Sequence, residues 1–493
     1  MNKILVANRG EIALRVMRTC KEMGIATVAV FSEADRNAPF VRFADEAVCI
    51  GPAASSESYL VMDRIIEVAT SLGVEGIHPG YGFLSENAEF AEKVAAANIT
   101  FIGPGTEAIR VMGSKLAAKD AVKKYNIPLV PGTEGAIDDM DEALKVAREI
   151  GFPVLVKASA GGGGKGMRTV TREEDLEEQI ELAMSEAKSA FGDSSVFIER
   201  FVTSPRHIEF QILADTHGNV VHLFERDCSV QRRHQKVIEE APSSVLTEEL
   251  RNEMGACAID VARSCDYVGA GTVEFMLDSQ NRFYFLEMNT RLQVEHPVTE
   301  EITGLDLVRE QIRVARGEEL GFTQDELTMK GHAIEIRVYA EDPTNNFLPD
   351  IGRLEVYRPP VGDGIRVDDG FEEGMDIPIY YDPMISKLIT YGPDRKAAIK
   401  RMIEAIDQYK VEGVSTTLSF CRFALEHEAF VSGNFDTQFV GNYFTPEKLH
   451  PFNEDEEQMA AFLVGKLFEE HSPKANINNS TSEPVSDWRK NRM

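Results

Sequence analysis

Hydrophobic and polar positions change in regular blocks along the first 112 residues. Short apolar runs predict strands at residues 4–7, 25–31, 76–78 and 99–102. Amphipathic stretches between these runs predict helices at residues 11–23, 58–72 and 87–97. Strands and helices that alternate in this way predict an open, mostly parallel, doubly wound α/β sheet.

The ends of these predicted strands are the places where such a sheet binds ligands. The first strand-to-helix turn lacks the Gly-x-Gly-x-x-Gly pattern, so we do not expect NAD to bind there. The segment His78-Pro-Gly-Tyr-Gly-Phe-Leu-Ser-Glu-Asn87 lies at another strand end and is a candidate ligand segment. It is equally well explained as a Gly/Pro turn in which Ser85 caps the following helix.

Farther along the chain, two strongly apolar segments joined by the polar residues 278–282 predict a β-hairpin with strands at residues 272–277 and 283–291. Strand side chains alternate between the two faces of a sheet. Glu287, Asn289 and Arg291 therefore share one face of the second strand.

Glu274 of the first strand is expected about opposite Glu287, because a short polar loop joins the two strands. Two opposed carboxylates repel each other, so the pair requires a cation between them or a proton on one carboxyl. A hard, oxygen-binding cation such as Mg²⁺ meets that need. The alternative is a solvated sheet face on which each carboxylate has a Lys or Arg neighbour. An amide and a guanidinium on the same face favour the metal site.

A glycine-rich loop, residues 158–168, follows an apolar strand at residues 152–157. Four consecutive glycines let backbone N–H groups approach a ligand closely, and Lys157, Lys165 and Arg168 add positive charge. We therefore predict a flexible cover over phosphate groups. The loop lacks the Gly-Lys-Ser/Thr of a Walker motif, and a plain linker is the alternative.

The rest of the chain is predicted to contain strands at residues 196–202, 206–213, 220–225 and 333–340 and a helix at residues 395–409. Residues 226–236 are rich in Arg, Lys and His, and we predict a cationic loop that forms the anion-holding wall of a pocket. On the last strand, Glu335, Arg337 and Tyr339 share one face. From residue 446 the chain becomes acidic and then rich in Ser, Asn and Pro, which predicts partial disorder.

Composition narrows the range of partners and compartments. The 52 basic and 81 acidic residues give a formal charge of −29, which argues against general binding to nucleic acid or anionic membranes. Any anionic substrate must then be held by a local cationic cluster. The six cysteines form no Cys-x-x-Cys pair, as expected of reduced thiols in a cytoplasmic protein. No apolar run is long enough for a signal peptide or a membrane span.

Five motifs, present together and in order, closely resemble the biotin carboxylase component of biotin-dependent carboxylases, an ATP-grasp family. These motifs lie at residues 8–13, 78–87, 157–168, 227–242 and 287–299. The resemblance covers roughly residues 1–444 and implies an α/β fold, α+β over the whole chain. It implies a Rossmann-like domain at 1–112, an ATP-grasp domain at 113–328 with a mobile lid near 131–204, a mixed C-terminal domain at 329–444, and an acidic and polar tail at 445–493.

The resemblance also implies a reaction. ATP and bicarbonate give carboxyphosphate and ADP, and CO₂ released from carboxyphosphate is captured by N1′ of biotin. The implied cofactors are ATP, Mg²⁺ (or Mn²⁺) and biotin.

Site residues follow from the resemblance position by position. Those implied to bind ATP are Lys115, Lys157, Gly161, Gly162, Gly163, Gly164, Gly166, Glu199, His207, Gln231 and His234. Those implied to bind the metal are Glu274, Glu287 and Asn289. Those implied to bind bicarbonate or biotin are Lys236, Arg291, Gln293, Val294 and Arg337. Glu295 resembles the base that deprotonates bicarbonate, and it acts with Lys236, Arg291 and Arg337 as the implied catalytic set.

Partners are implied as well. No Met-Lys-Met biotinylation motif occurs, so we expect biotin on a separate biotin carboxyl carrier protein and a carboxyltransferase on another chain. The family often forms homodimers, and we expect one. Ala160 and Lys165 resemble the lids of propionyl-CoA or methylcrotonyl-CoA carboxylases more than the bacterial acetyl-CoA type. The final acceptor, an acyl-CoA or pyruvate, stays open.

Two other functions compete with this one. Another ATP-grasp ligase, of the carbamoyl-phosphate or purine-pathway kind, would share the predicted metal hairpin but is not expected to retain Arg337 and the run Gln293–His296. A silent scaffold subunit would have no physical reason to keep clustered like charges at Glu274, Glu287 and Glu295.

Overall fold

The computed structural model describes residues 1–133, 135–137, 140–158 and 167–449, and in the tail residues 459, 462–464, 466 and 467. The predicted phosphate cover lies mostly outside the described residues, including Gly161, Gly162, Gly163, Gly164 and Gly166 as well as Ala160 and Lys165. The chain divides into one unit at Met1–Pro446 and a second at Glu447–Met493. The sheets that form the site belong to the first unit. None of the described helices is long and apolar enough to cross a membrane.

The N-terminal region is the predicted parallel, doubly wound sheet. Its strands are hydrogen-bonded in the order β3-β2-β1-β4-β5, and every pair is parallel. The strands are β1 (Lys3–Val6), β2 (Ala26–Ser32), β3 (Glu46–Gly51), β4 (Gly76–His78) and β5 (Thr100–Phe101). Their helices are α1 (Gly10–Glu22), α2 (Pro39–Phe43), α3 (Met62–Ser71) and α4 (Ala88–Ala96).

Three details of this region differ from the sequence prediction. Strand β3 was not predicted, although residues 47–50 form a short apolar run; it is a partly exposed strand at the edge of the sheet. Helix α3 begins at Met62 rather than near residue 58. Ser85 as the cap of α4 is wrong: the Asn87 side chain accepts the hydrogen bond from the Phe90 N–H at 2.8 Å.

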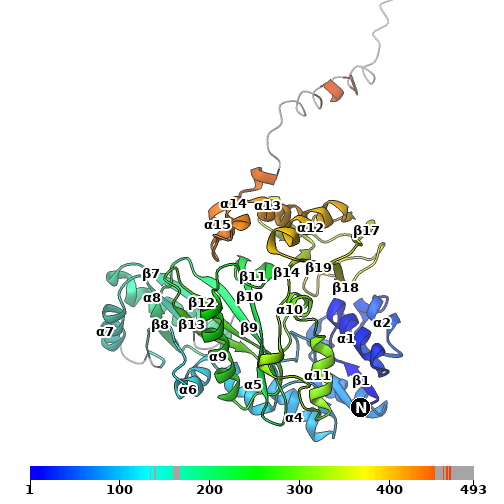
Figure 1. Ribbon diagram of the computed structural model, residues 1–493, viewed down its shortest axis with the longest axis horizontal. Helices are drawn as coiled ribbons and strands as arrows, with labels where there is room; N and C mark the ends of the chain where they lie inside the picture. Colours follow the sequence, from blue (N-terminus) through cyan, green and yellow to red (C-terminus); the bar gives the residue numbers. More distant parts are fainter. Residues whose placement is uncertain are drawn as a thin grey trace, which may run out of the picture. The chain divides into compact units, whose positions relative to one another are not determined.

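A small lobe follows the N-terminal sheet and lies at the left of Figure 1. Its three antiparallel strands, in the order β7-β6-β8, share one apolar core with two helices. The elements of this stretch are α5 (Thr106–Gly113), α6 (Lys115–Lys123), α7 (Met140–Ile150), β6 (Val154–Ala158), β7 (Met167–Val170), α8 (Leu176–Phe191) and β8 (Val196–Arg200).

An eight-stranded sheet forms the centre of the unit, in the order β13-β12-β9-β10-β11-β14-β19-β18 (Figure 1). All seven neighbouring pairs in it are antiparallel. The strands are β9 (Arg206–Ala214), β10 (Val220–Arg232), β11 (Gln235–Ala241), β12 (Gly269–Leu277), β13 (Phe283–Asn289), β14 (His332–Tyr339), β18 (Ile365–Asp369) and β19 (Met384–Gly392). Pairing of β11 with β14 joins the region predicted as ATP-grasp to the region predicted as C-terminal domain.

The predicted cationic loop at 226–236 is wrong. Strand β10 runs on through Arg232, and β11 starts at Gln235, so this segment is a hairpin whose turn is Arg233 and His234, both with positive φ. The many charged residues favoured the prediction of a loop, because charged residues usually lie in exposed loops. Here Arg226 and Asp227 are completely buried.

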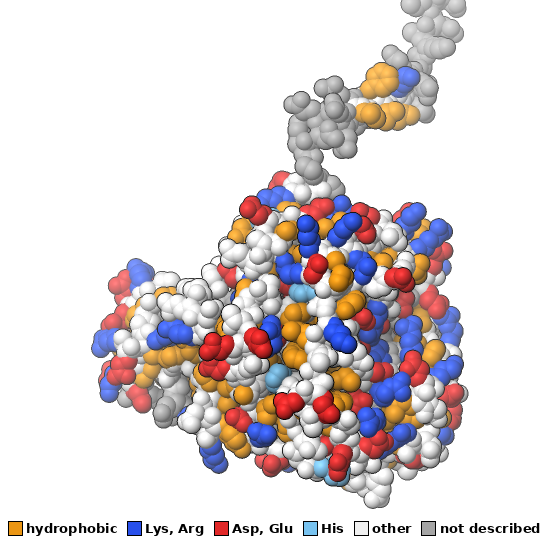
Figure 2. Space-filling model, in the orientation of Figure 1, with side chains coloured by type: hydrophobic (Ala, Val, Ile, Leu, Met, Phe, Trp, Pro, Cys, Tyr) orange, Lys and Arg blue, Asp and Glu red, His pale blue; other side chains and the backbone are white. Residues whose placement is uncertain are grey.

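Helices and short strands complete the unit around these sheets. The helices are α9 (Glu248–Arg263), α10 (His296–Thr303), α11 (Leu307–Ala315), α12 (Arg395–Gln408), α13 (Leu418–Glu426), α14 (Glu428–Val431) and α15 (Phe439–Tyr443). The short strands are β15 (Glu341–Asp342), β16 (Leu348–Pro349), β17 (Val356–Arg358) and β20 (Lys410–Glu412). Figure 2 shows acidic and basic side chains interspersed on one face of this unit, without a broad basic patch there.

Candidate active site

The predicted carboxylate pair is present in the predicted hairpin. Strands β12 and β13 are antiparallel, and Glu274 is the register partner of Glu287. A β-bulge after Glu274 sets this register, since Leu277 pairs with Phe283 nearer the turn. Without the bulge Glu274 would oppose Leu286, so one extra residue brings the second carboxylate onto the same face.

The pair has the electrostatics expected of a cation site. Burial would raise the pKa of Glu274, but Lys236 and His207 hold it well below its usual range. Burial and then the charge of Glu274 raise the pKa of Glu287, so Glu287 loses its proton less readily than an ordinary glutamate. A divalent cation between the two carboxylates would favour the ionised form of Glu287, and carboxylate oxygens are the ligands that such a cation prefers. The residues therefore fit Mg²⁺.

Asn289 ties this pair to the neighbouring arginine. Its Nδ2 donates to Glu274 Oε1 at 2.9 Å, and its Oδ1 accepts from Arg291 Nη2 at 3.1 Å. Asn289 therefore links Glu274 to Arg291 by hydrogen bonds, while Glu287 lies opposite Glu274 in the strand register. Their role in metal binding remains a prediction.

Lys236 joins the predicted metal pair to the predicted base. Its Nζ lies 3.0 Å from Glu274 Oε1 and 2.7 Å from Glu295 Oε1, and it also contacts Glu209. Although burial opposes it, the surrounding carboxylates raise the pKa of Lys236 well above its usual range. One fully charged ammonium group thus holds three buried carboxylates together.

Glu295 is held between two cations. Besides Lys236, Arg337 Nη2 donates to Glu295 Oε2 at 2.9 Å, while Arg337 Nε donates to Glu239 Oε1 at 2.7 Å. Burial would raise the pKa of Glu295, but Lys236 and Arg337 lower it. The carboxyl is therefore ionised at neutral pH, the form that a general base requires.

A cavity of about 480 Å³ opens beside this ion network. Its walls include three of the residues predicted to bind bicarbonate or biotin, namely Arg291, Val294 and Arg337. They also include the motif at residues 8–12 and the aromatic residues Tyr81, Phe83, Tyr339, Tyr380 and Tyr381. Cationic and aromatic groups in one concave site suit a small polar substrate.

Gln293 and Val294 are oriented by hydrogen bonds to residues that do not line the cavity. Gln293 Nε2 donates to Glu274 Oε1 at 2.8 Å, and its Oε1 accepts from Arg226 Nη2 at 2.9 Å. The Val294 carbonyl accepts from Lys387 Nζ at 2.9 Å. Both residues are therefore fixed before any ligand arrives, which limits the reorganisation that binding would need.

The residues predicted to bind nucleotide fall into two groups. In the first, Glu199 accepts from Lys157 Nζ at 2.6 Å and from Lys119 Nζ at 2.5 Å. Burial lowers the pKa of Lys115, which lies close enough to Glu287 and Lys157 to feel their charges. Lys115 therefore lies near both Lys157 of the small lobe and Glu287 of the predicted metal pair.

The second group lies in the central sheet. His207 Nε2 is 3.2 Å from Glu274 Oε2, and despite burial Glu274 raises the pKa of His207 to about 9. Gln231 Nε2 donates to the Cys228 carbonyl at 2.8 Å, and His234 lies exposed at the β10–β11 turn. His207 thus borders the predicted metal pair, and its nucleotide role stays a prediction.

Four charged residues of the network were missed in the sequence. They are Glu209, Arg226, Glu239 and Lys387, all fully buried. Glu209 had a usable signal, because the predicted strand at 206–213 alternates faces and puts residues 207, 209 and 211 on one side. Arg226 belongs to the segment predicted as a cationic wall, although not as a buried residue, and Glu239 and Lys387 had no signal, since their partners are distant in the sequence.

The segment at residues 78–87 contributes to the 480 Å³ cavity beside the ion network, which we call the catalytic cavity. Tyr81, Gly82 and Phe83 line it, and Glu86 Oε2 accepts from Arg291 Nε at 2.8 Å. His78 anchors the segment, with its Nδ1 accepting from the Gly80 N–H at 3.0 Å.

We expect His78 to make the protein less stable in acid. Burial lowers the pKa of His78 to about 4, so between that pH and the ordinary histidine pKa of 6.5 the unfolded chain binds more protons than the folded one, and stability falls as pH decreases. From pH 7 to pH 5 the loss from this residue alone is about 2 kcal/mol. Denaturation midpoints at both pH values, for wild type and His78→Asn, measure it. A wild type that loses no more than the variant would contradict the expectation.

Comparison with known proteins gives three family matches along the chain. Residues 1–109 match "Biotin carboxylase, N-terminal domain", residues 114–323 match "Carbamoyl-phosphate synthase L chain, ATP binding domain", and residues 335–442 match "Biotin carboxylase C-terminal domain".

Individual relatives agree with these matches. Biotin carboxylase 1 of Bacillus subtilis is 52% identical over 444 residues, which is 90% of this chain and 99% of that protein. The human mitochondrial propionyl-CoA carboxylase alpha chain is 53% identical over 470 residues, 95% of this chain but 65% of that protein. A crystal structure of the biotin carboxylase domain dimer of Hydrogenobacter thermophilus 2-oxoglutarate carboxylase, with MgADP, ADP and bicarbonate, superposes with a TM-score of 0.87. It is 46% identical and covers 92% of this chain and 99% of that one.

Proposed function

The chain belongs to the biotin carboxylase family, and from that premise we propose how its residues divide the work of the reaction. The protein is an ATP-dependent ligase of the ATP-grasp fold that uses ATP, Mg²⁺ and bicarbonate to carboxylate biotin. This is the first half-reaction of a biotin-dependent carboxylase. The finer assignment of residues and partners is our proposal.

We assign the base to Glu295. Bicarbonate is a poor nucleophile until it loses its proton, so an ionised carboxylate must lie within hydrogen-bond reach. Glu295 is ionised between Lys236 and Arg337, and its neighbours Val294 and Arg337 line the 480 Å³ cavity; this observation carries the proposal. Lys236 and Arg291 hold the dianion that results.

Arg337 is assigned to the second step. The ureido oxygen of biotin gains negative charge only as N1′ attacks CO₂, and a fixed guanidinium stabilises such charge without reorganising. Glu239 keeps Arg337 in place by accepting from its Nε at 2.7 Å.

The nucleotide side needs positioning and charge neutralisation more than covalent chemistry. Lys115 and Lys157 are assigned to the phosphate groups, with the glycine loop as their cover. Glu274 and Glu287, helped by Asn289, are assigned to Mg²⁺. When bound, Mg²⁺ would neutralise phosphate oxygens and hold them in line for transfer.

We propose that biotin is presented by a biotin carboxyl carrier protein, with a carboxyltransferase completing the reaction. The 493 residues contain no Met-Lys-Met motif. A homodimer is proposed from the dimeric relative, and a cytoplasmic location from the unpaired cysteines.

The assay that tests this function is ADP release with ATP, Mg²⁺ and bicarbonate, with and without free biotin. We expect biotin to stimulate ADP release. Arg337→Ala should lower the biotin-stimulated rate roughly 100-fold, the usual cost of removing one charge-stabilising donor. Arg422→Ala, on the surface of α13, is the matched control. Turnover indifferent to biotin would favour another ATP-grasp ligase, and nucleotide binding without turnover would favour a scaffold.

A further inference from the structure

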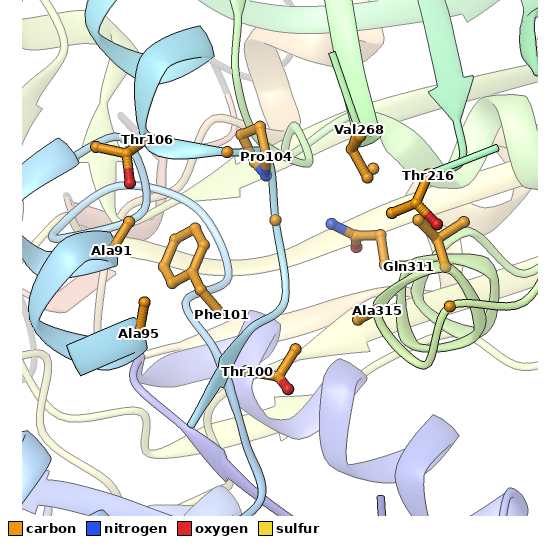
Figure 3. Close-up of a pocket in the computed structure, with 15 residues that line it drawn as sticks. Ala91, Ala95, Thr100, Phe101, Pro104, Thr106, Thr216, Val268, Gln311 and Ala315 are labelled. Carbon is orange, nitrogen blue, oxygen red and sulfur yellow. The ribbon is translucent and has the colours of Figure 1, made fainter. Parts of the chain in front are cut away.

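A second cavity, of about 360 Å³, lies between the N-terminal sheet and helix α11 (Figure 3). Its walls come from α4, the β5–α5 connection, the start of β12 and the end of α11. It shares no lining residue with the catalytic cavity. No residue implied to bind ATP, Mg²⁺, bicarbonate or biotin lines it, so the reaction leaves this cavity unexplained.

The walls are mostly apolar and carry no charged side chain. The Phe101 ring and the methyl groups of Ala91 and Ala95 form one side, and Val268 and Ala315 lie across from them in Figure 3. No Asp, Glu, Lys, Arg or His is among the lining residues. A charged ligand would be left without a counter-ion, which is costly in such surroundings. The cavity therefore suits a neutral molecule.

The polar side chains in these walls are the hydroxyls of Thr100, Thr106 and Thr216 and the amide of Gln311. Gln311 is 4% exposed, and Figure 3 shows its amide directed from α11 toward Pro104 and Val268. The neighbouring His78 fixes which end of the amide faces the cavity. His78 Nδ1 accepts from the Gly80 N–H at 3.0 Å, so in the neutral ring the proton is on Nε2.

That proton must be donated to the amide oxygen, since His78 Nε2 lies 3.3 Å from Gln311 Oε1. The NH₂ group of Gln311 is then the end of the amide that does not bond to His78. It has no hydrogen-bond partner in the part of the chain that the structure describes. This donor faces solvent in the cavity, and an acceptor on a bound molecule would take the place of water as its hydrogen-bond partner.

We propose that this cavity is a binding site for a small neutral molecule whose carbonyl or ether oxygen accepts a hydrogen bond from Gln311. A volume of about 360 Å³ is within the range of small-ligand sites, and its apolar walls would cover the rest of the molecule. This site goes beyond the proposed function and does not depend on it.

The site is also connected to the catalytic cavity. Gln311 holds His78, His78 holds Gly80, and the next residues, Tyr81 to Phe83, line the catalytic cavity. The Asn8 side chain secures the same segment by donating to the Pro79 and Tyr81 carbonyls, both at 2.7 Å. A ligand that restrains Gln311 therefore acts on the segment that borders the biotin side, and we expect it to change the KM for biotin about fivefold.

Two matched probes test the binding. 5-Fluoroindan-1-one has a carbonyl oxygen, and 5-fluoroindane has the same shape without it. ¹⁹F NMR titrations of both on the full chain, with saturating ADP and Mg²⁺ to block the nucleotide site, should give about tenfold tighter binding for the ketone. Equal affinities, or no binding of the ketone, would overturn the proposal.

Variants locate the bound probe. Ala91→Leu fills the cavity from α4, and we expect at least a tenfold loss of ketone affinity. Ala96→Leu, exposed on the same helix and outside the lining, should change nothing. Gln311→Leu should abolish the preference for the ketone over the hydrocarbon. Ketone binding that survives Ala91→Leu would place the probe elsewhere and refute the site, and an unchanged KM for biotin with the ketone bound would refute the connection.

Discussion

Replacing Glu295 by glutamine is expected to reduce bicarbonate-dependent ADP formation roughly 100- to 10,000-fold, the contribution of a positioned general base. Glutamine has nearly the same shape, but its single oxygen can accept from only one of Lys236 and Arg337, because an NH₂ group replaces the other carboxylate oxygen. It cannot take a proton from bicarbonate, so the change removes chemistry and preserves packing. Steady-state ADP release at saturating bicarbonate and biotin measures the loss.

Glu239→Gln is the matched control for Glu295→Gln. Both carboxylates accept from Arg337 and both are buried, but burial raises the pKa of Glu239 to about 7. Its neutral form is therefore well populated at neutral pH, and we expect the amide to cost less than about tenfold, the worth of one ordinary hydrogen bond. Equal losses in the two variants would mean that Glu295 only positions Arg337, and the base would have to be sought elsewhere.

Replacing Arg226 by leucine is expected to destabilise the first unit by about 3–5 kcal/mol, because removal of one partner strands buried charge. The Arg226 side chain is completely buried and donates to five side chains at 2.6–3.1 Å. These partners are Glu209, Gln211, Thr272, Gln293 and Thr299. Leucine would leave Glu209 ionised and without one of its two strong cationic partners.

The denaturation midpoint and the yield of folded protein measure this loss. Arg148→Leu is the control, since Arg148 pairs with Glu173 on the surface with 60% of its side chain exposed. Exposed pairs of that kind contribute about 0–1 kcal/mol. An Arg226 variant as stable as the Arg148 variant would show that the buried network tolerates an uncompensated carboxylate, contrary to expectation.

The hairpin of Glu274 and Glu287 shows what the sequence could predict. Apolar runs, the alternating faces of a strand and a short polar connection identified both strands and the facing carboxylates. The bulge that establishes their register was beyond reach, because a single extra residue leaves no mark in the pattern of polar and apolar positions.

Other parts of the site depend on contacts between distant segments. Lys236 was predicted from the family resemblance, but its simultaneous contact with Glu209, Glu274 and Glu295 depends on how β9, β11 and β12 line up with the start of α10. The β10–β11 hairpin was missed for the same reason. Its charged residues are neutralised by partners far along the chain, so local polarity predicted a loop where the structure has a strand.

The pairing of β11 with β14 has a consequence for how the two parts of the chain evolve. Because the central sheet runs without a break from the ATP-grasp side to the C-terminal side, neither part can be exchanged between related enzymes as an independent cassette. A recombination point between residues 242 and 331 would replace only one of the two facing strands, and β11 and β14 of different ancestry would have to match register and side chains. The two parts should therefore change together in evolution, as a single inherited block.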